Sequence, residues 1–367
     1  MMSGNGKPIR VLLVGPSLRN LGGQAIQARR LLEAFGTLPD LTPSFLPIDP
    51  PLPGPLGLLQ RVRFVRTIVT ELAYLASLVA RIPRADVVHV FSASYFSFLL
   101  APAPAILLAR LFGKRVVLNY RSGEADDHLA RWGWHVTPIL RLAHAIVTPS
   151  GYLVEVFARH GLAAESVENF VDLDAIPFRV RAHPAPRFLA NRNFESLYNV
   201  ACVVRAFAAI QQEVPAASLT LVGKGSQRAD LQALAEALGL RDVTFTAAVP
   251  PEEMARLYGE AEVYLNAPNI DNMPNSVIEA FAAGLPVVST AAGGIPFIVT
   301  DGVDGLLVPV GDSAALARAA LRVLREPGLA ERLTSAARAR VVRTYSWDAV
   351  RVRWLALYRR LATRSAA

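Results

Sequence analysis

Two carboxylates and a row of polar residues fall together in residues 269–290, NIDNMPNSVIEAFAAGLPVVST. A strand is expected to end near residue 267, a polar loop to follow, and a helix to begin near Asn275. Asp271 and Glu279 lie eight residues apart, one before the helix and one about a turn into it. A carboxylate can accept hydrogen bonds from two neighbouring hydroxyl groups, which suits a ribose or hexose ring. The spacing therefore predicts a sugar-like ligand at the start of this helix.

The predicted helix start also offers a site for an anion. The first backbone N–H groups of a helix have no partner within the helix and attract phosphate. Here these groups belong to Met273, Asn275 and Ser276, while Pro274 suits the entrance of a helix. The competing interpretation is a capping box formed by Ser276 and Glu279, which needs no ligand.

This pattern resembles the retaining glycosyltransferases of family 4 (glycosyl transferases group 1), which have the GT-B fold. Their motif is a glutamate, seven residues, a second glutamate and a Gly-Leu-Pro-Val-Val turn. This chain has Asp271, then Glu279, then the turn at residues 284–288. The resemblance implies that Glu279 binds the donor ribose and that Asp271 approaches the donor sugar, followed by the backbone amides of Asn272 and Met273. The aspartate is one methylene shorter than the family's glutamate.

The resemblance continues in residues 187–200, RFLANRNFESLYNV. There the family carries an arginine and then a Lys-Gly pair, and both cations meet the donor diphosphate. Arg192 matches the arginine, whereas Tyr198 stands in the place of the lysine. Lys224, in a later loop, is a candidate for the second charge, the alternative being an ordinary turn lysine. The nucleotide base is expected to be held by backbone and packing around this loop and Val249.

Two further elements lie in the N-terminal half. Gly22 and Gly23 follow the first predicted strand, and glycines at such a place let the backbone approach a ligand closely. The resemblance implies a loop near the donor phosphates and the acceptor, and the alternative is a plain turn. Arg121 stands where many relatives have a His-Gly pair near the transferred sugar. It is a candidate to bind a charged acceptor or the developing phosphate charge.

A cluster of Glu124, Asp126, Asp127 and His128 superficially suggests a metal site. All four lie close to a predicted helix start, where they are better explained as dipole partners and solvated charge. No metal site is expected. The other histidines have no partner spacing and are interpreted as structural, with His89 at a strand end expected to face the cleft.

The elements that must position these residues alternate between short β-rich runs and longer helical patterns. This alternation indicates parallel sheets with crossover helices. The predicted strands are residues 11–15, 86–91, 115–120, 145–150, 187–190, 218–225, 242–248, 262–268, 286–290 and 305–310. The predicted fold class is α/β, and the resemblance implies GT-B: two Rossmann-like, doubly wound domains that face each other across a cleft.

The expected domains are an acceptor-side domain at residues 1–170 and a donor-binding domain at residues 187–346. A proline-rich linker at residues 171–186 separates them. A helix at about residues 347–367 is expected to pack back on the first domain. Residues 39–57 contain seven prolines, so that part of this segment is expected to be irregular loop.

The chain has 367 residues and a formal net charge of +8. Of its 38 basic residues only three are lysines, and the arginines are dispersed, which argues against nucleic-acid binding. The single cysteine excludes a disulfide scaffold. Residues 1–10 do not resemble a secretory signal, and the uncharged residues 91–109 are expected to form a strand, a loop and a buried helix. A cytoplasmic protein is therefore expected.

The basic excess lies in the N-terminal half, where residues 1–184 contain 19 basic and 13 acidic residues. Residues 61–80 place Arg61, Arg63 and Arg66 beside a helical apolar stretch. The favoured interpretation is an amphipathic helix packed on a sheet. The functional alternative is a peripheral contact with an anionic membrane surface.

The resemblance implies transfer of a hexose from a UDP- or GDP-linked sugar to a glycan or lipid-linked acceptor, as in polysaccharide or cell-wall biosynthesis. It also implies retention of configuration without a metal or other cofactor. A catalytically degenerate sugar-nucleotide-binding protein is the alternative, because Asp271, Tyr198 and Phe297 replace the usual residues. A pyridoxal-phosphate phosphorylase and a Rossmann dehydrogenase are disfavoured, since lysines are few and a GxGxxG fingerprint is missing.

Overall fold

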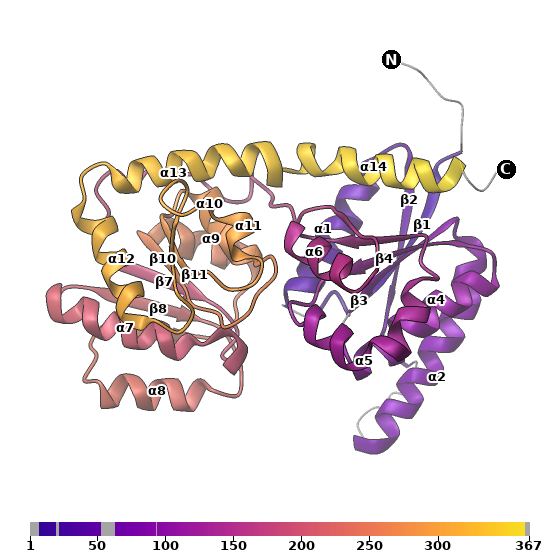
Figure 1. Ribbon diagram of the computed structural model, residues 1–367, viewed down its shortest axis with the longest axis horizontal. Coiled ribbons are helices and arrows are strands. Elements are labelled where there is room, and N and C mark those ends of the chain that lie inside the picture. Colours follow the sequence, from indigo (N-terminus) through magenta and orange to yellow (C-terminus); the bar gives the residue numbers. More distant parts are fainter. Residues whose placement is uncertain (1–6, 20–21, 53–62, 93, 364–367) are drawn as a thin grey trace, which may run out of the picture. The chain divides into compact units, whose positions relative to one another are not determined.

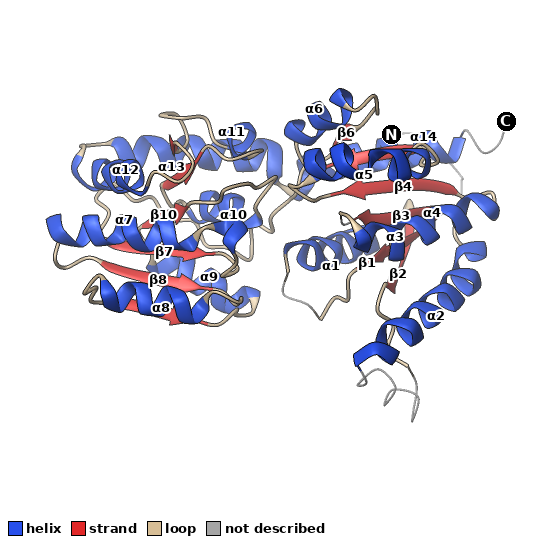
Figure 2. Ribbon diagram, turned by 60° about the horizontal axis from the view of Figure 1, so that its bottom comes forward, coloured by secondary structure: helices blue, strands red, loops and turns tan. Residues whose placement is uncertain are grey.

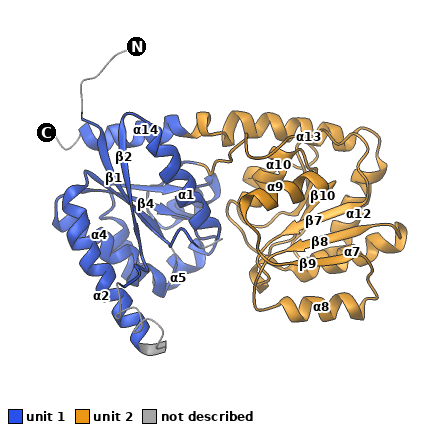
Figure 3. Ribbon diagram, turned by 180° about the vertical axis from the view of Figure 1, so that it is seen from behind, with its two compact units in different colours: residues 1–167, 351–367 blue, residues 168–350 orange. Residues whose placement is uncertain are grey.

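The computed structural model describes residues 7–19, 22–52, 63–92 and 94–363, which form parts of two compact units (Figure 1). The first unit comprises residues 1–167 and 351–367, and the second comprises residues 168–350 (Figure 3). Each unit contains a six-stranded sheet whose paired strands are all parallel within the described residues. The predicted α/β class with two doubly wound domains is therefore confirmed.

The sheet of the first unit has the order β2-β1-β3-β4-β5-β6. Its strands are β1 (Ile9–Gly15), β2 (Leu41–Pro47), β3 (Val87–Ser92), β4 (Arg115–Tyr120), β5 (Ala145–Thr148) and β6 (Glu165–Ser166). All six residues of β3 are buried, as expected for a parallel strand covered on both faces. The strand order reverses between β1 and β3, which creates a switch point at the carboxyl edge of the sheet.

Strand β2 lies in the proline-rich segment, part of which was expected to be irregular loop and for which no strand was predicted. It pairs with β1 alone, at the edge of the sheet, and includes Pro43 and Pro47. An edge strand tolerates prolines because one side of its backbone needs no partner in the sheet. The proline count concealed the strand for this reason. Residues 53–62 of the same segment lie outside the described part of the chain.

Helices cover both faces of this first sheet (Figure 2). On one face, α1 (Gly23–Gly36) meets α14 (Trp347–Thr363), where Phe35 contacts the rings of Trp354 and Tyr358. The helices of the other face are α2 (Arg63–Arg81), α3 (Phe96–Leu100), α4 (Pro102–Leu111), α5 (Ala125–Leu140) and α6 (Gly151–Arg159), with a 3-10 turn at Ile82–Arg84 after α2. Residues 91–109 contain the expected strand end and the expected helix, α4, which is buried on one side, but the short helix α3 stands where a loop was expected.

The sheet of the second unit has the order β12-β11-β10-β7-β8-β9. Its strands are β7 (Arg187–Asn191), β8 (Ser218–Val222), β9 (Val243–Thr246), β10 (Val263–Asn266), β11 (Val287–Thr290) and β12 (Leu306–Val308). Each was predicted from the sequence within a few residues. The order reverses between β7 and β10, so that the switch point lies where residues 192 and 267 begin their loops.

The helices of this second unit are α7 (Val200–Glu213), α8 (Arg228–Ala237), α9 (Pro251–Glu260), α10 (Asn275–Ala283), α11 (Ile295–Ile298), α12 (Ser313–Arg325) and α13 (Leu329–Arg340). A 3-10 turn at Ser196–Tyr198 precedes α7, and a π turn at Val341–Tyr345 follows α13. Helix α10 is buried on all sides from Ser276 to Ala283. A helix enclosed in this way holds its side chains in fixed directions.

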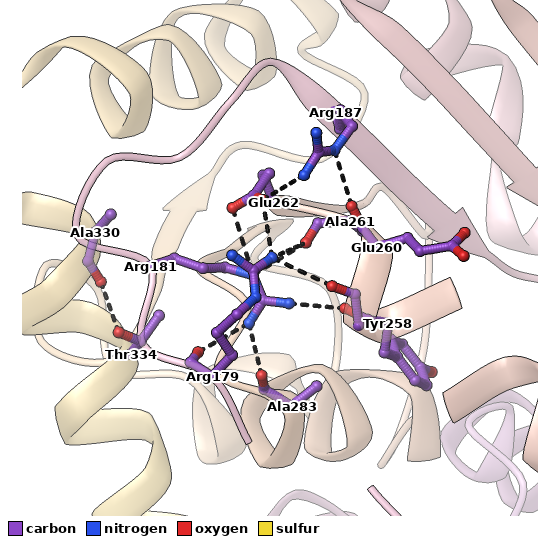
Figure 4. Close-up of polar contacts among 11 residues, drawn as sticks. Arg179, Arg181, Arg187, Tyr258, Glu260, Ala261, Glu262, Ala283, Ala330 and Thr334 are labelled. Atoms are coloured by element: carbon purple, nitrogen blue, oxygen red, sulfur yellow. Dashed lines mark hydrogen bonds and ion pairs between the residues drawn. The ribbon is translucent and has the colours of Figure 1, made fainter. Parts of the chain in front are cut away.

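The segment predicted as a linker, residues 171–186, lies within the second unit and is held there by arginines (Figure 4). The fully buried side chain of Arg181 donates to the carbonyl oxygens of Tyr258 (2.8 Å), Ala261 (3.0 Å) and Ala283 (2.6 Å). These carbonyls lie at the carboxyl ends of α9 and α10, where a cation is favourable. One side chain therefore joins the ends of two neighbouring helices.

In the described part of the chain, no helix combines the length and the apolarity that crossing a membrane would require.

Candidate functional site

The start of α10 is the centre of the candidate site. The residue that caps it is Pro274, which makes no side-chain cap hydrogen bond, and Ser276 lies inside the helix. The capping-box interpretation is therefore wrong. Instead, Ser276 Oγ accepts from Arg192 Nη1 at 3.2 Å, and Glu279 Oε2 accepts from the Tyr258 hydroxyl at 2.9 Å. Both side chains that were candidates for a cap point to other elements.

Arg192 follows β7 and forms an ion pair with Asp271, which follows β10. Their side chains are 11% and 14% exposed, so the pair is shielded from water. Burial by itself would lower the pKa of Arg192, but Asp271 and neighbouring tyrosines outweigh it, and the pKa is raised. The guanidinium also lies 4.2 Å from the ring centre of Tyr198. The arginine is permanently charged and is held from three sides.

Two consecutive glycines let one loop approach these residues closely. A Cβ on Gly293 or Gly294 would lie 2.3 or 2.1 Å from the carbonyl oxygens of Asp271 and Asn272. Any other residue type would push this loop away from its neighbour, which explains why glycines stand here. Asp271 also accepts a hydrogen bond from the backbone N–H of Asn272 at 2.8 Å, which fixes its carboxylate.

The loop of Lys224 lies beside the loop of Arg192. The carbonyl oxygen of Lys224 accepts from the backbone N–H of Phe194 at 2.9 Å, and a Cβ on Gly223 would lie 2.1 Å from the Arg192 carbonyl oxygen. Lys224 itself is exposed. The structure thus brings the two predicted cations into adjacent loops. Val249 is half-buried and packs against the core cluster that includes α10.

Asn169 contributes to the site and was not recognised in the sequence. Its side-chain amide donates to the carbonyl oxygen of Met273 and to Asn275 Oδ1, both at 2.9 Å. The backbone N–H of Asn169 contacts the sulfur of Met273 at 3.4 Å. Asn169 lies more than 100 residues before this loop, so no local spacing indicated the contact. It fixes the loop that leads into α10.

Polar atoms that are buried without a partner concentrate at the ends of two strands. Among the described residues of the second unit they include Asn191 Oδ1 at the end of β7, Arg192 Nε directly after it, and Asn266 Oδ1 at the end of β10. Unsatisfied buried groups are rare in folded proteins and frequently mark functional positions. These three lie at the switch point of the sheet, where ligands bind in open α/β folds.

In the first unit, Gly22 and Gly23 lie at the start of α1, after β1. A Cβ on Gly22 would meet nothing within 4 Å, so packing does not require a glycine there. Gln24 Nε2 donates to the carbonyl oxygen of Ser92 at 3.2 Å, across the switch point of this sheet. The proposed role of the two glycines toward a ligand stays a prediction.

Arg121 follows β4 and is also in the first unit. It donates to Asn119 Oδ1 at 3.3 Å and lies 5.8 Å from the ring centre of Phe91. Burial lowers the pKa of Arg121 to about 9. A partly desolvated guanidinium of this kind favours the approach of an anion.

Two histidines differ from their predictions. His89 is fully buried and contacts the Tyr358 hydroxyl (2.6 Å) and the Asn119 amide (3.0 Å). The expectation that His89 faces a cleft is therefore wrong, and its contacts agree with the structural role that was also predicted. His128 is not solvated: it is fully buried and contacts the Tyr120 hydroxyl at 2.7 Å. Its neighbour Asp127 lies in the first turn of α5, as expected.

No group of histidine, cysteine or carboxylate side chains that could hold a metal ion occurs among the described residues. The candidate site of the second unit brings together a buried guanidinium and two carboxylates. These side chains lie at the N-terminus of a buried helix. Such a set can bind an anion together with several hydroxyl groups.

Comparison with known proteins agrees with this chemistry. Residues 186–326 match the family model described as Glycosyl transferases group 1. Over 211 residues the chain is 31% identical to a phosphatidyl-myo-inositol mannosyltransferase of Mycobacterium leprae, covering 55% of each chain. Over 288 residues it is 29% identical to a glycogen synthase of Mycobacterium tuberculosis, covering 73% of this chain and 67% of the synthase. The chain thus spans about half the length of the mannosyltransferase.

Solved structures resemble the whole chain. HepE of Anabaena, in complex with UDP and glucose, has a TM-score of 0.73 at 16% identity, over 95% of this chain and 99% of HepE. A sucrose-phosphate synthase of Thermosynechococcus elongatus has a TM-score of 0.73 at 21% identity, over 98% of this chain and 100% of the synthase. At these identities the likeness concerns the fold alone. Residues 186–326 are therefore similar to the group 1 glycosyltransferases, within a chain that has the GT-B fold.

Proposed function

We propose that this chain transfers a hexose from a nucleotide diphosphate-sugar to a glycan or lipid-linked acceptor, with retention of the anomeric configuration. The observation that carries the proposal is the contact of Arg192 with both Asp271 and Ser276 at the start of α10. A guanidinium and a helix N-terminus suit a diphosphate, and carboxylates suit sugar hydroxyls. HepE, solved with UDP and glucose, supports a donor of this class. The mannosyltransferase and glycogen synthase relatives support lipid-linked and glycan acceptors.

In the proposed reaction, the bond between the sugar C1 and the diphosphate oxygen breaks. An acceptor hydroxyl oxygen forms the new bond to C1 on the same face, and its proton passes to the leaving phosphate oxygen. Arg192 has five N–H donors, so it can bind diphosphate oxygens through those that Asp271 and Ser276 do not use. Together with the amides at the start of α10 it would stabilise the charge that develops on the leaving group.

Other predicted residues have supporting roles in this proposal. Glu279 binds the donor ribose, and Asp271 approaches the donor sugar. Lys224 and the loop of Gly22 and Gly23 meet the phosphates, while Arg121 stabilises phosphate charge or binds a charged acceptor.

Thermal-shift measurements with UDP-glucose, GDP-mannose and ADP-glucose would identify the donor, and nucleotide release with candidate acceptors would measure transfer. We expect stabilisation by one donor, followed by transfer that persists in EDTA, since no metal is proposed to take part. Binding without donor hydrolysis or transfer would favour the degenerate sugar-nucleotide binder. Absence of binding to all three donors would contradict the proposal.

We also propose that the first unit lies at the cytoplasmic surface of an anionic membrane, which would bring a lipid-linked acceptor within reach. The supporting observation is a stripe on α2 formed by Val65, Ile68, Leu72 and Val79, each at least 36% exposed. Their spacing of three, four and seven residues places them on one side of the helix. The exposed cation Arg66 belongs to the same helix. Apolar side chains beside arginines are typical of helices that lie in a membrane interface.

Sedimentation with vesicles of phosphatidylglycerol or of phosphatidylcholine tests this attachment. We expect the wild-type chain to bind the anionic vesicles and the variant I68S/L72S to lose most of this binding. The control V303S/V342S replaces two exposed valines of the second unit and should bind as the wild type does. Equal binding by all three proteins would contradict the role of α2.

A further inference from the structure

Glu279 occupies an unusual position for a charged side chain. It lies within α10, whose residues from Ser276 to Ala283 are all buried, and it is 9% exposed. A carboxylate in such surroundings needs hydrogen-bond donors to keep its charge and its direction. Its orientation is therefore decided by the groups that surround it rather than by water.

One of these groups is Tyr258 of α9. Its hydroxyl donates to Glu279 Oε2 at 2.9 Å, and its side chain is 1% exposed. Burial raises the pKa of Tyr258 well above its ordinary value, and the adjacent carboxylate adds to this effect. The phenol is therefore always protonated and always available as a donor.

The direction of that proton is also determined. Asn191 Nδ2 donates to the Tyr258 hydroxyl oxygen at 2.8 Å, from the end of β7. An oxygen that accepts from Asn191 directs its own proton to its remaining partner, Glu279. Asn191 directly precedes Arg192, so the chain of hydrogen bonds begins next to the arginine of the candidate site.

The backbone of Tyr258 is fixed as well (Figure 4). Arg181 donates to the Tyr258 carbonyl oxygen at 2.8 Å and to the Ala283 carbonyl oxygen, at the end of α10, at 2.6 Å. Because the same guanidinium holds the ends of α9 and α10, the distance between Tyr258 and Glu279 is fixed by the fold. A hydroxyl of a rigid side chain on a rigid helix is a precise positioning device.

We infer that Tyr258, oriented by Asn191, is a positioning residue that sets the Glu279 carboxylate in the direction required to accept hydrogen bonds from the donor ribose. The inference rests on the proposed function, in which Glu279 binds that ribose. Tyr258 itself touches no substrate. Its loss should therefore reduce the recognition of the ribose hydroxyls specifically, while the affinity for the phosphates persists.

The experiment compares the binding of UDP, 2′-deoxy-UDP and 3′-deoxy-UDP to the full chain by calorimetry. In the wild type, removing a ribose hydroxyl that Glu279 binds should weaken affinity on the order of tenfold. In Y258F the loss of affinity caused by removing that hydroxyl should fall to about twofold or less. A misdirected carboxylate no longer distinguishes UDP from the deoxy analogue. The control Y345F removes the hydroxyl of another buried tyrosine of the same core cluster and should keep the full penalty.

A second variant serves if Y258F unfolds. N191D replaces the amide donor with an acceptor, which attracts the Tyr258 proton away from Glu279 and should also reduce the penalty. An undiminished penalty in a folded Y258F or N191D would overturn the inference and leave the proposed function intact. Wild-type protein that binds UDP and both deoxy analogues equally would overturn the role of Glu279 and that of Tyr258 with it. If the protein binds GDP or ADP but not UDP, the deoxy analogues of the bound nucleotide are compared in the same way. If it binds none of the three nucleotides, the proposed function is overturned as well.

Discussion

The two units have the same kind of sheet but different side-chain chemistry at the carboxyl ends of their strands. In the second unit the strand ends carry charge: Arg192 is paired with Asp271, and Glu279 lies on the adjacent helix. In the first unit the strand ends combine the partly buried cation Arg121 with neutral hydrogen bonds, in which Tyr120 contacts both Ser94 and His128. Buried charges are costly unless they serve a partner or a ligand. The two sheets share a backbone architecture, but the side chains at the strand ends decide the chemistry.

Among the variants proposed here, replacing Arg192 should reduce turnover most, because the replacement removes the central cation at the switch point of the second unit. For R192M we expect turnover to fall by about 100-fold or more, as for the loss of one preorganised donor at a developing charge. Product formation with the identified donor measures this. The control R228M removes an arginine that lies 5.9 Å from the ring centre of Phe194 in the same unit and should retain turnover. Equal losses in both variants would show that the effect is not specific to the proposed site.

The next largest effect should come from E279Q, which keeps the shape of the side chain and removes its charge. We expect donor affinity to weaken by about 1–3 kcal/mol, the range for hydrogen bonds to a charged group. Calorimetry with the preferred nucleotide measures the change. The control E213Q affects an exposed glutamate paired with Arg325 in the same unit, and should bind as the wild type does. Unchanged affinity in a folded E279Q would remove the carboxylate from the site.

Two buried histidines of the first unit should make that unit sensitive to acid. Burial lowers the pKa of His89 to about 3 and that of His128 to about 4, below the ordinary value of 6.5. As the pH falls below 6.5, the unfolded chain takes up protons that the folded chain does not, so stability decreases until the folded pKa is reached. Each histidine should cost up to about 1.4 kcal/mol per pH unit.

Urea unfolding followed by tryptophan fluorescence at about pH 7 and about pH 5 measures this loss. The variant H89Q keeps an amide for Asn119 and Tyr358 but cannot titrate, so its stability should depend less on pH. A pH dependence in H89Q as steep as in the wild type would assign the acid sensitivity to other groups.

The smallest expected loss of activity is for Tyr198. The centre of its aromatic ring lies 4.2 Å from the guanidinium of Arg192. Y198L should reduce kcat/KM by the equivalent of about 1 kcal/mol, the scale of a partly shielded cation–π contact. Y198F keeps the face and should retain activity. If Y198F were as impaired as Y198L, the hydroxyl rather than the ring would be responsible, and the support of Arg192 would have to be reassigned.

The sequence indicated much of this molecule because its strands are strongly patterned. Every strand of the second sheet was predicted, since buried parallel strands are short apolar runs between turn residues. Strand β2 was missed because prolines at a sheet edge look like those of a loop. The polarity of Asp271, Ser276 and Glu279 and their place at a helix start were also evident from spacing alone.

Other features depend on residues that are distant in the chain. Asn169 fixes Met273 and Asn275 across more than 100 residues, and Tyr258 meets Glu279 from a different helix. That the Ser276 hydroxyl does not form a capping box likewise depends on Arg192, which arrives from another strand. Local sequence determines which segments become strands and helices, because backbone preference and apolar periodicity act over a few residues. Only the tertiary structure decides which side chains meet, because the direction of a buried polar group is set by whichever distant partner satisfies it.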